Sequence, residues 1–143
     1  MRPFACMLIF FGLTLVAVSS WAAGTSASSL PRGAELVGVA QSGGNDHLLD
    51  QQMKVELDSL LPRLRQLPAD SPILIESHYP ANNKGGKEGR IKRAYALAEQ
   101  VQQYLTSRHN LRFDYYISVW ESGYGNADGR PKVRISAYPV DFF

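Results

Sequence analysis

The sequence predicts an α+β fold, a two-layer sandwich in which two helices pack on one face of a mixed sheet. Two long stretches place apolar residues three and four positions apart, which is the period of a helix buried on one side. Shorter segments are continuously apolar or alternate between apolar and polar residues, as strands do. The order is β-α-β-α-β-β, with the first three strands joined through helical crossovers. In chain order the segments are 34–40, 49–67, 72–77, 91–105, 115–120 and 132–138.

The first 22 residues are typical of a secretory signal peptide and are set apart from the fold. Arg2 supplies a positive start, residues 4–18 are apolar, and Ser20-Trp21-Ala22 resembles a cleavage site between small residues. The apolar run is shorter than the roughly 18 residues that a membrane span needs, so we expect cleavage, with an uncleaved anchor as the alternative. Residues 23–33 are then a flexible leader and 34–143 the folded domain. The expected location is the periplasm, with association with the outer membrane or the cell wall left open and with no membrane span after cleavage.

The composition excludes several classes of function. The only cysteine, Cys6, lies in the signal peptide, so the mature chain would have no disulfide, no cysteine-bound zinc and no thiol catalysis. Cleavage after residue 22 of the 143 leaves enough chain for one domain. It also lowers the formal net charge from +2 to +1, because Arg2 is the only charged residue removed. Nothing in that balance indicates a nucleic-acid partner.

The first half of the domain follows from three local patterns. Residues 34–40 are a short apolar run that predicts a strand, and the glycine-rich cluster at 41–46 ends it. Pro62 falls inside the pattern of the first helix and is expected to kink it or to separate its last turn. The apolar start of residues 72–77 predicts a strand that is covered on both faces. The apolar stripe of the first helix is Leu49, Met53, Leu57, Leu60, Leu64 and Leu67.

The second half begins with a polar loop that contains Pro80 and two glycines. A second helix follows and is expected to end near residues 107–110. Residues 115–120 and 132–138 alternate like strands, and the segment 121–130 between them has three glycines and is expected to be a loop. The stripe of the second helix is Ile91, Ala94, Leu97, Ala98, Val101, Tyr104 and Leu105.

Three segments in this order resemble the OmpA-like, or OmpA C-terminal, family of peptidoglycan-associating domains. They are ILIESHYP at 73–80, GRIKRAYALAEQVQQYL at 89–105 and ISVWESGYGNADGRPKVRISAY at 117–138. The segment LDSLLPRLRQLP at 57–68 is similar to the first helix of the family, including its closing proline. The resemblance covers roughly residues 34–140 and implies the same two-layer fold.

The resemblance also implies a ligand, the diaminopimelate residue of the peptidoglycan stem peptide. In the family an aspartate after the strand meets the ammonium group of this ligand, and an arginine near the helix start meets its carboxylate. Arg93 matches the arginine, His78 matches a histidine of the strand-end motif, and Ser77 replaces its glycine. The aspartate position falls on Pro80, which has neither a charge nor a backbone N–H.

The missing aspartate predicts weakened or lost binding to diaminopimelate by the usual mode of the family. An unpaired ammonium in a partly buried site costs about 1–3 kcal/mol. Glu76 or Glu88 are the candidates to replace the lost carboxylate. The expected ligand residue is Arg93, with further contributions from Ser77, His78, Asn82, Asn83 and Arg90. Without the resemblance, Arg93 would be a half-buried arginine that bonds to loop carbonyls.

No catalytic or metal site is expected, and neither is a cofactor. The three histidines have no compact metal-ligand spacing, and no nucleophile motif accompanies the serines. Two functions stay open. One is a non-catalytic periplasmic domain that contacts peptidoglycan through Arg93. The alternative is a protein–protein scaffold in a secretion, pilus or motor assembly of the envelope, which has lost peptidoglycan binding with the replacement by Pro80.

Overall fold

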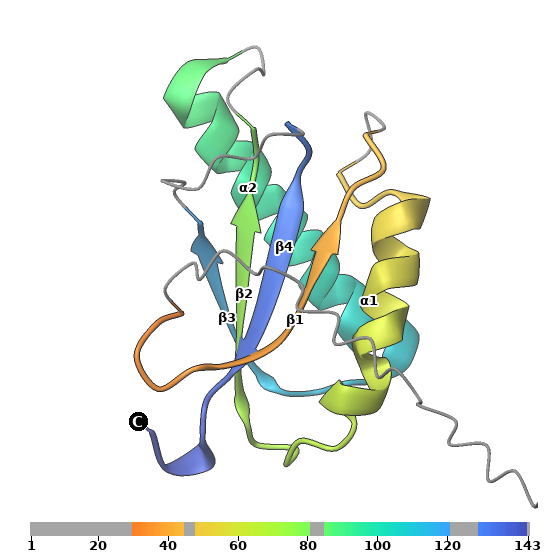
Figure 1. Ribbon diagram of the computed structural model, residues 1–143, viewed down its shortest axis with the longest axis vertical. Coiled ribbons are helices and arrows are strands. Elements are labelled where there is room, and N and C mark those ends of the chain that lie inside the picture. Colours follow the sequence, from red (N-terminus) through yellow and green to blue (C-terminus); the bar gives the residue numbers. More distant parts are fainter. Residues whose placement is uncertain (1–29, 45–47, 81–84, 121–128, 143) are drawn as a thin grey trace, which may run out of the picture.

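The computed structural model describes residues 30–44, 48–80, 85–120 and 129–142. The expected signal peptide, most of the expected leader and the loop residues Asn82 and Asn83 lie outside these ranges. The described residues form two helices and a four-stranded mixed sheet (Figure 1), which confirms the predicted α+β fold. None of the helices within these ranges is both long and apolar enough to cross a membrane.

The sheet has the strand order β1-β4-β2-β3. Strand β4 lies between β1 and β2 and is antiparallel to both, whereas β2 and β3 are parallel. The last strand in sequence therefore fills the gap that the first helical crossover leaves between β1 and β2. The strands are β1 Glu35–Gln41, β2 Pro72–His78, β3 Asp114–Val119 and β4 Lys132–Ala137.

Both helices pack on the same face of the sheet, and in Figure 1 α2 runs behind the strands whereas α1 stands beside β1. Helix α1 (Gln51–Leu64) packs beside β1, and α2 (Gly86–Gln103) packs across β2 and β3. Helix α2 continues as one π-helical turn, Tyr104–Arg108, and the chain then turns at Asn110, whose φ is 54°. Pro62 stands in the last turn of α1, which ends two residues later at Leu64. The expected effect of Pro62 is thus confined to the end of the helix.

Asp50 joins the end of β1 to the start of α1. Its Oδ1 accepts the backbone N–H of Met53 at 2.9 Å, which caps the helix. Its Oδ2 accepts the hydroxyl of Ser42 at 2.6 Å and the N–H of Gly43 at 2.7 Å. A single buried carboxylate therefore sets the angle between the strand and the helix that follows it.

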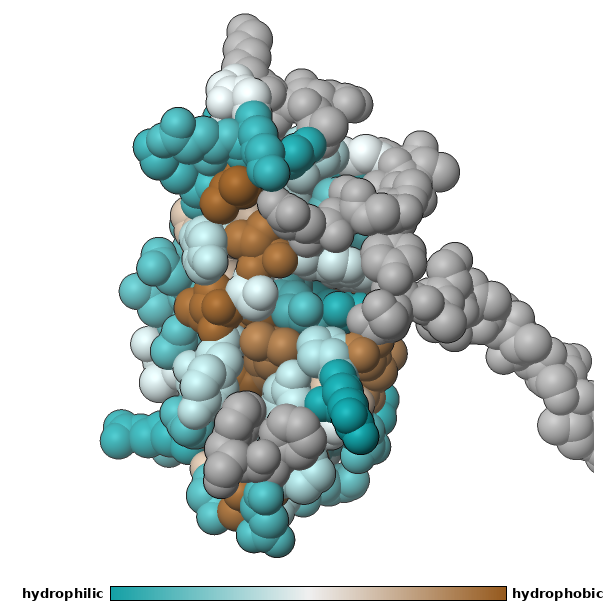
Figure 2. Space-filling model, turned by 90° about the vertical axis from the view of Figure 1, so that its left-hand side faces the viewer, coloured by the Kyte–Doolittle hydropathy of each residue, from teal (hydrophilic) through white to brown (hydrophobic). Residues whose placement is uncertain are grey.

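The two edges of the sheet differ. Side chains of α1 reach the free edge of β1, where Glu56 accepts the N–H of Gln41 at 2.7 Å and Arg63 donates to the carbonyls of Leu36 and Val37 at 3.1 and 2.6 Å. The other edge is β3. The side of the molecule that β3 and α2 form carries a broken column of apolar side chains with polar groups on both sides (Figure 2).

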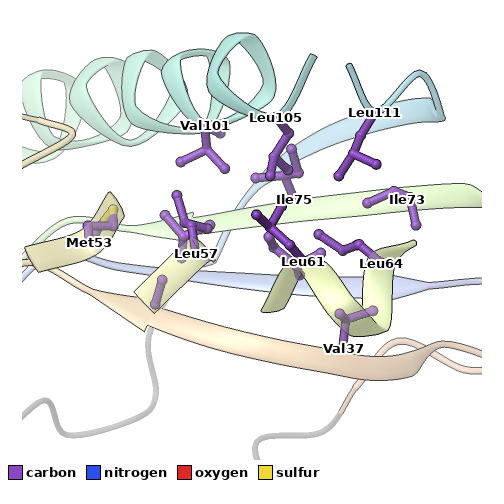
Figure 3. Close-up of a cluster of buried hydrophobic side chains, with 14 of the residues drawn as sticks. Val37, Met53, Leu57, Leu61, Leu64, Ile73, Ile75, Val101, Leu105 and Leu111 are labelled. Carbon is purple, nitrogen blue, oxygen red and sulfur yellow. The ribbon is translucent and has the colours of Figure 1, made fainter. Parts of the chain in front are cut away.

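The core lies between the helices and the sheet (Figure 3). Ile73 and Ile75 of β2 point into it, opposite Ala137 and Ile135 of β4. Leu61, which the predicted stripe of the first helix omits, is buried, and the predicted Leu60 is only partly buried. The buried side chains of the two helices are Met53, Leu57, Leu61, Leu64, Ala94, Leu97, Ala98 and Val101.

Strand β2 is covered on both faces, as predicted, although helices lie on only one of them. On the face away from the helices, Glu76 and Arg134 form an ion pair of 2.7 Å in which both side chains are buried. The guanidinium of Arg134 also lies 4.4 Å from the centroid of the Trp120 ring. A charged pair and an aromatic ring thus cover this face, where an apolar second layer is absent from the described residues.

Candidate functional site

A pocket of about 240 Å³ lies where the carboxyl ends of β2 and β3 meet the first turns of α2. The parallel pairing of these strands brings Ser77 beside Val119, and Trp120 continues the ladder by donating its N–H to the carbonyl of Ser77 at 2.8 Å. The strand ends and the helix start therefore form one site from three separate segments. The pocket is lined by His78, Tyr79, Lys87, Arg90, Ile91, Ala94, Val119 and Trp120.

The charged groups among the described residues of this pocket are cationic. They are Lys87 and Arg90. They are three positions apart, so they share one side of α2. The helix starts at Gly85 without a side-chain cap, and its N-terminal N–H groups add a partial positive charge. The pocket is therefore suited to an anionic group.

His78 has a defined hydrogen bond at the floor of the pocket. Its Nδ1 lies 3.2 Å from the carbonyl oxygen of Trp120. Because a carbonyl only accepts, Nδ1 carries the proton in this bond, and Nε2 of the neutral ring is an acceptor. The two rings also meet edge to face, with centroids 6.3 Å apart. His78 can therefore accept a hydrogen bond from a ligand N–H or O–H.

Arg93, the expected ligand residue, does not line the pocket. Its guanidinium lies 5.6 Å from the centroid of the Tyr79 ring, and its Nη1 is 3.4 Å from the Tyr79 hydroxyl. Tyr79 itself lines the pocket. Arg93 therefore contacts a residue of the pocket lining without being part of that lining.

Ser77 has a structural partner. It is fully buried, and its hydroxyl donates to the backbone carbonyl of Ala94 at 2.5 Å, which ties the end of β2 to α2. Of the residues predicted for the site, the structure brings His78 and Arg90 into the pocket and places Ser77 and Arg93 next to it. Asn82 and Asn83 lie outside the described residues.

Neither candidate for the missing carboxylate reaches the pocket. Glu76 is paired with Arg134 on the face of the sheet away from the helices. Glu88 lies on an exposed part of α2, 3.0 Å from Lys92. The family's pairing of an acid with an arginine is therefore absent from the described part of this site, and only its cationic half is present.

Sequence reasoning missed four prominent lining residues. Lys87 precedes Arg90 by three positions and was missed because the predicted helix begins at residue 91, whereas α2 begins at Gly86. Tyr79 and Trp120 follow the ends of two predicted strands, but only the parallel register of β2 and β3 places them at one site. The same holds for Val119, which a pattern alone would assign to the core.

No protein-family model matches this chain, and no relative was found among the curated proteins. No group of three or more His, Cys, Asp or Glu side chains among the described residues could hold a metal ion.

Proposed function

We propose that this chain is a non-catalytic domain of the cell envelope that binds peptidoglycan through a carboxylate of the stem peptide. The observation that carries the proposal is the pocket in which the cations Lys87 and Arg90 stand beside the aromatic rings of Tyr79 and Trp120. The element order and the position of the pocket agree with the resemblance to the OmpA-like domains. The expected binding mode differs from that of the family, because the aspartate position of the family motif is occupied by Pro80 and neither Glu76 nor Glu88 lines the pocket.

The roles of the residues follow from their chemistry. Arg90 offers a planar fork that binds a carboxylate through two hydrogen bonds, and Lys87 adds a second charge. The rings of Tyr79 and Trp120 cover the aliphatic part of the ligand. His78 accepts one hydrogen bond through Nε2. Arg93 acts as a positioning residue, because its contact is with Tyr79.

The test is co-sedimentation of the purified chain with peptidoglycan sacculi. We expect Arg90→Ala and Lys87→Ala to weaken binding about ten- to hundredfold, since each loses a charge-assisted contact of about 1.5–3 kcal/mol. Arg93→Ala should have a smaller effect. Lys92→Ala is the matched control, because Lys92 is an exposed cation of the same helix that pairs with Glu88. Circular dichroism establishes that each variant is folded.

A second arm tests the ligand group itself. We expect sacculi with amidated stem carboxylates to bind the wild type weakly. This binding should be no stronger than the binding of Arg90→Ala to untreated sacculi. If the folded wild type does not sediment with untreated sacculi, the proposal fails. The scaffold function in an envelope assembly, which the replacement of the family aspartate by Pro80 also favours, would then be the remaining candidate.

A further inference from the structure

A second cleft lies on the helical layer, away from the pocket at the strand ends. The last turns of α2 pass behind α1 in the view of Figure 1, and a cleft of about 370 Å³ lies between the two elements there. It is separate from the first pocket, because the two have no lining residue in common. The cleft is lined by Leu49, Lys54, Gln100, Gln103, Tyr104, Ser107 and Arg108.

Lys54 is a half-buried cation whose position the fold does not explain. It is the fourth residue of α1, close to the positive end of the helix dipole, where a cation is unfavourable. Asp58 stands at the spacing of a helical ion pair. However, Asp58 accepts the hydroxyl of Tyr104 at 2.8 Å and lies 2.9 Å from Nε2 of His109. Among the described residues the ammonium of Lys54 forms neither a hydrogen bond nor an ion pair.

Arg108 brings a second cation to the same cleft from a different element. It is the last residue of the π-helical turn, and short π-helical turns occur often at functional sites. Within the described parts of the chain its guanidinium makes no hydrogen bond or ion pair. The cleft therefore holds two cations whose charges the described residues do not compensate, and it is suited to an anionic ligand.

The uncharged groups of the cleft are suited to a peptide. Gln100 and Gln103 are exposed, and they share one side of α2 because they are three positions apart. A side-chain amide has both donors and an acceptor, so it can bond to the N–H and the C=O of a peptide chain. The hydroxyl of Ser107 has the same two capacities. Leu49 and Tyr104 are partly buried and supply apolar contact.

We propose that this cleft binds an acidic peptide segment of a partner protein. Arg108 holds a carboxylate through two hydrogen bonds, Lys54 meets another as a point charge, and the two glutamines bond to the peptide backbone. The site goes beyond the proposed binding of peptidoglycan and does not compete with it. Ten positions of helix separate Arg90 from Gln100, which is about 15 Å along the axis. The chain can therefore hold a ligand at each end of α2.

The experiment is an NMR titration of the isotope-labelled full chain with a short blocked peptide of alternating glutamate and alanine. We expect the largest shift changes at the backbone amides of Lys54, Gln100, Gln103 and Arg108. Lys54→Gln combined with Arg108→Gln should raise the dissociation constant more than about tenfold, because two charge-assisted contacts are lost. Arg65→Gln is the matched control, since Arg65 is an exposed cation at the other end of α1. Circular dichroism establishes that each variant is folded.

Two further comparisons separate this site from the peptidoglycan site. Arg90→Ala should leave the affinity for the peptide unchanged, and the double glutamine variant should sediment with sacculi as the wild type does. Failure of one proposal therefore leaves the other intact.

The ligand class is tested with two other probes. The same peptide with glutamine in place of glutamate should bind more than about tenfold more weakly, because it has no carboxylates. The proposal is overturned if millimolar glutamate peptide causes no shift changes at the cleft, or if the double variant binds this peptide as tightly as the wild type. An oligomer of galacturonate that binds the cleft more tightly than the peptide also overturns it, and would assign the cleft to an acidic glycan.

Discussion

At the scale of single residues, the buried ion pair of Glu76 and Arg134 determines the character of the face of the sheet that lies away from the helices. Both side chains are buried, and their 2.7 Å contact joins neighbouring strands β2 and β4. A buried ion pair contributes little net stability against an apolar pair of the same shape, but each charge is costly when its partner is removed. The pair therefore gives specificity to the register of two central strands.

We predict that Glu76→Leu lowers the free energy of unfolding by about 3–5 kcal/mol, because Arg134 would remain buried without its carboxylate. Glu76→Leu combined with Arg134→Met should recover most of this loss. Urea denaturation measures both. Glu88→Leu is the control, since it breaks an exposed pair, and it should cost less than about 1 kcal/mol. A single substitution at Glu76 as mild as this control would contradict the role given to the pair.

At the scale of elements, the link between β1 and α1 depends on one side chain. Asp50 caps α1 through Met53 and also binds Ser42 and Gly43 at the end of β1. The cap alone is worth about 1 kcal/mol, and hydrogen bonds to a buried carboxylate add about 1.5–3 kcal/mol. This one residue therefore places the helix on the strand that it follows.

Asp50→Ala should lower the free energy of unfolding by about 2–4 kcal/mol, which thermal and urea denaturation can measure. Asp50→Asn separates the two contributions. An asparagine keeps one oxygen for the N–H of Met53, but its amide nitrogen cannot accept from Ser42 or Gly43. We expect an intermediate loss for it. An asparagine variant as stable as the wild type would show that the contact with β1 contributes nothing.

The element boundaries also show where sequence patterns are informative. The predicted segment 72–77 is the strand Pro72–His78, and 132–138 is Lys132–Ala137. Alternation and apolar runs determine such strands locally. The face of the first helix was less well predicted, since Leu61 is buried where Leu60 was expected. Leu60 and Leu61 are adjacent, so each fits one of two neighbouring apolar stripes along the helix. Only the packing of the helix against the sheet decides which of the two is buried.

At the scale of the whole molecule, stability should depend on alkaline pH through the tyrosines. Burial raises the pKa of Tyr115 to about 12 from its ordinary value of 10.0. Burial, followed by the hydrogen bond to Asp58, also raises the pKa of Tyr104. A raised pKa means that the folded state keeps a proton which the unfolded state loses above pH 10. Stability from these groups is therefore fully present below about pH 10 and is lost as the pH rises towards 12.

We predict that the free energy of unfolding falls between about pH 10 and about pH 12, and that Tyr115→Phe reduces this slope. Urea denaturation at several pH values in this interval measures it for both proteins. Subtracting the slope of Tyr115→Phe from the slope of the wild type removes the contribution of other groups that titrate between these pH values. Equal slopes in the two proteins would contradict a role of Tyr115 in alkaline unfolding.

The candidate site belongs to the same scale, because no single element contains it. Its cations come from α2, and its rings come from the ends of β2 and β3. The sequence pointed to His78 and Arg90 through a resemblance of motifs, and these two residues do line the pocket. It favoured Arg93 over Arg90 as the ligand residue. In the structure Arg90 lines the pocket, whereas the guanidinium of Arg93 lies over the ring of Tyr79, which lines it.

By itself, the sequence determined the α+β class, the order of the elements and the bounds of the strands to within one residue, because hydrophobic period and turn residues act over a few positions. Only the tertiary structure decided that β4 enters between β1 and β2, that Glu76 pairs with Arg134, and that Trp120 reaches the pocket. It also decided that Glu56 and Arg63 of α1 bond to backbone groups at the free edge of β1. These features depend on contacts between residues that are distant in the chain, and a local pattern carries no information about which distant partner a side chain meets.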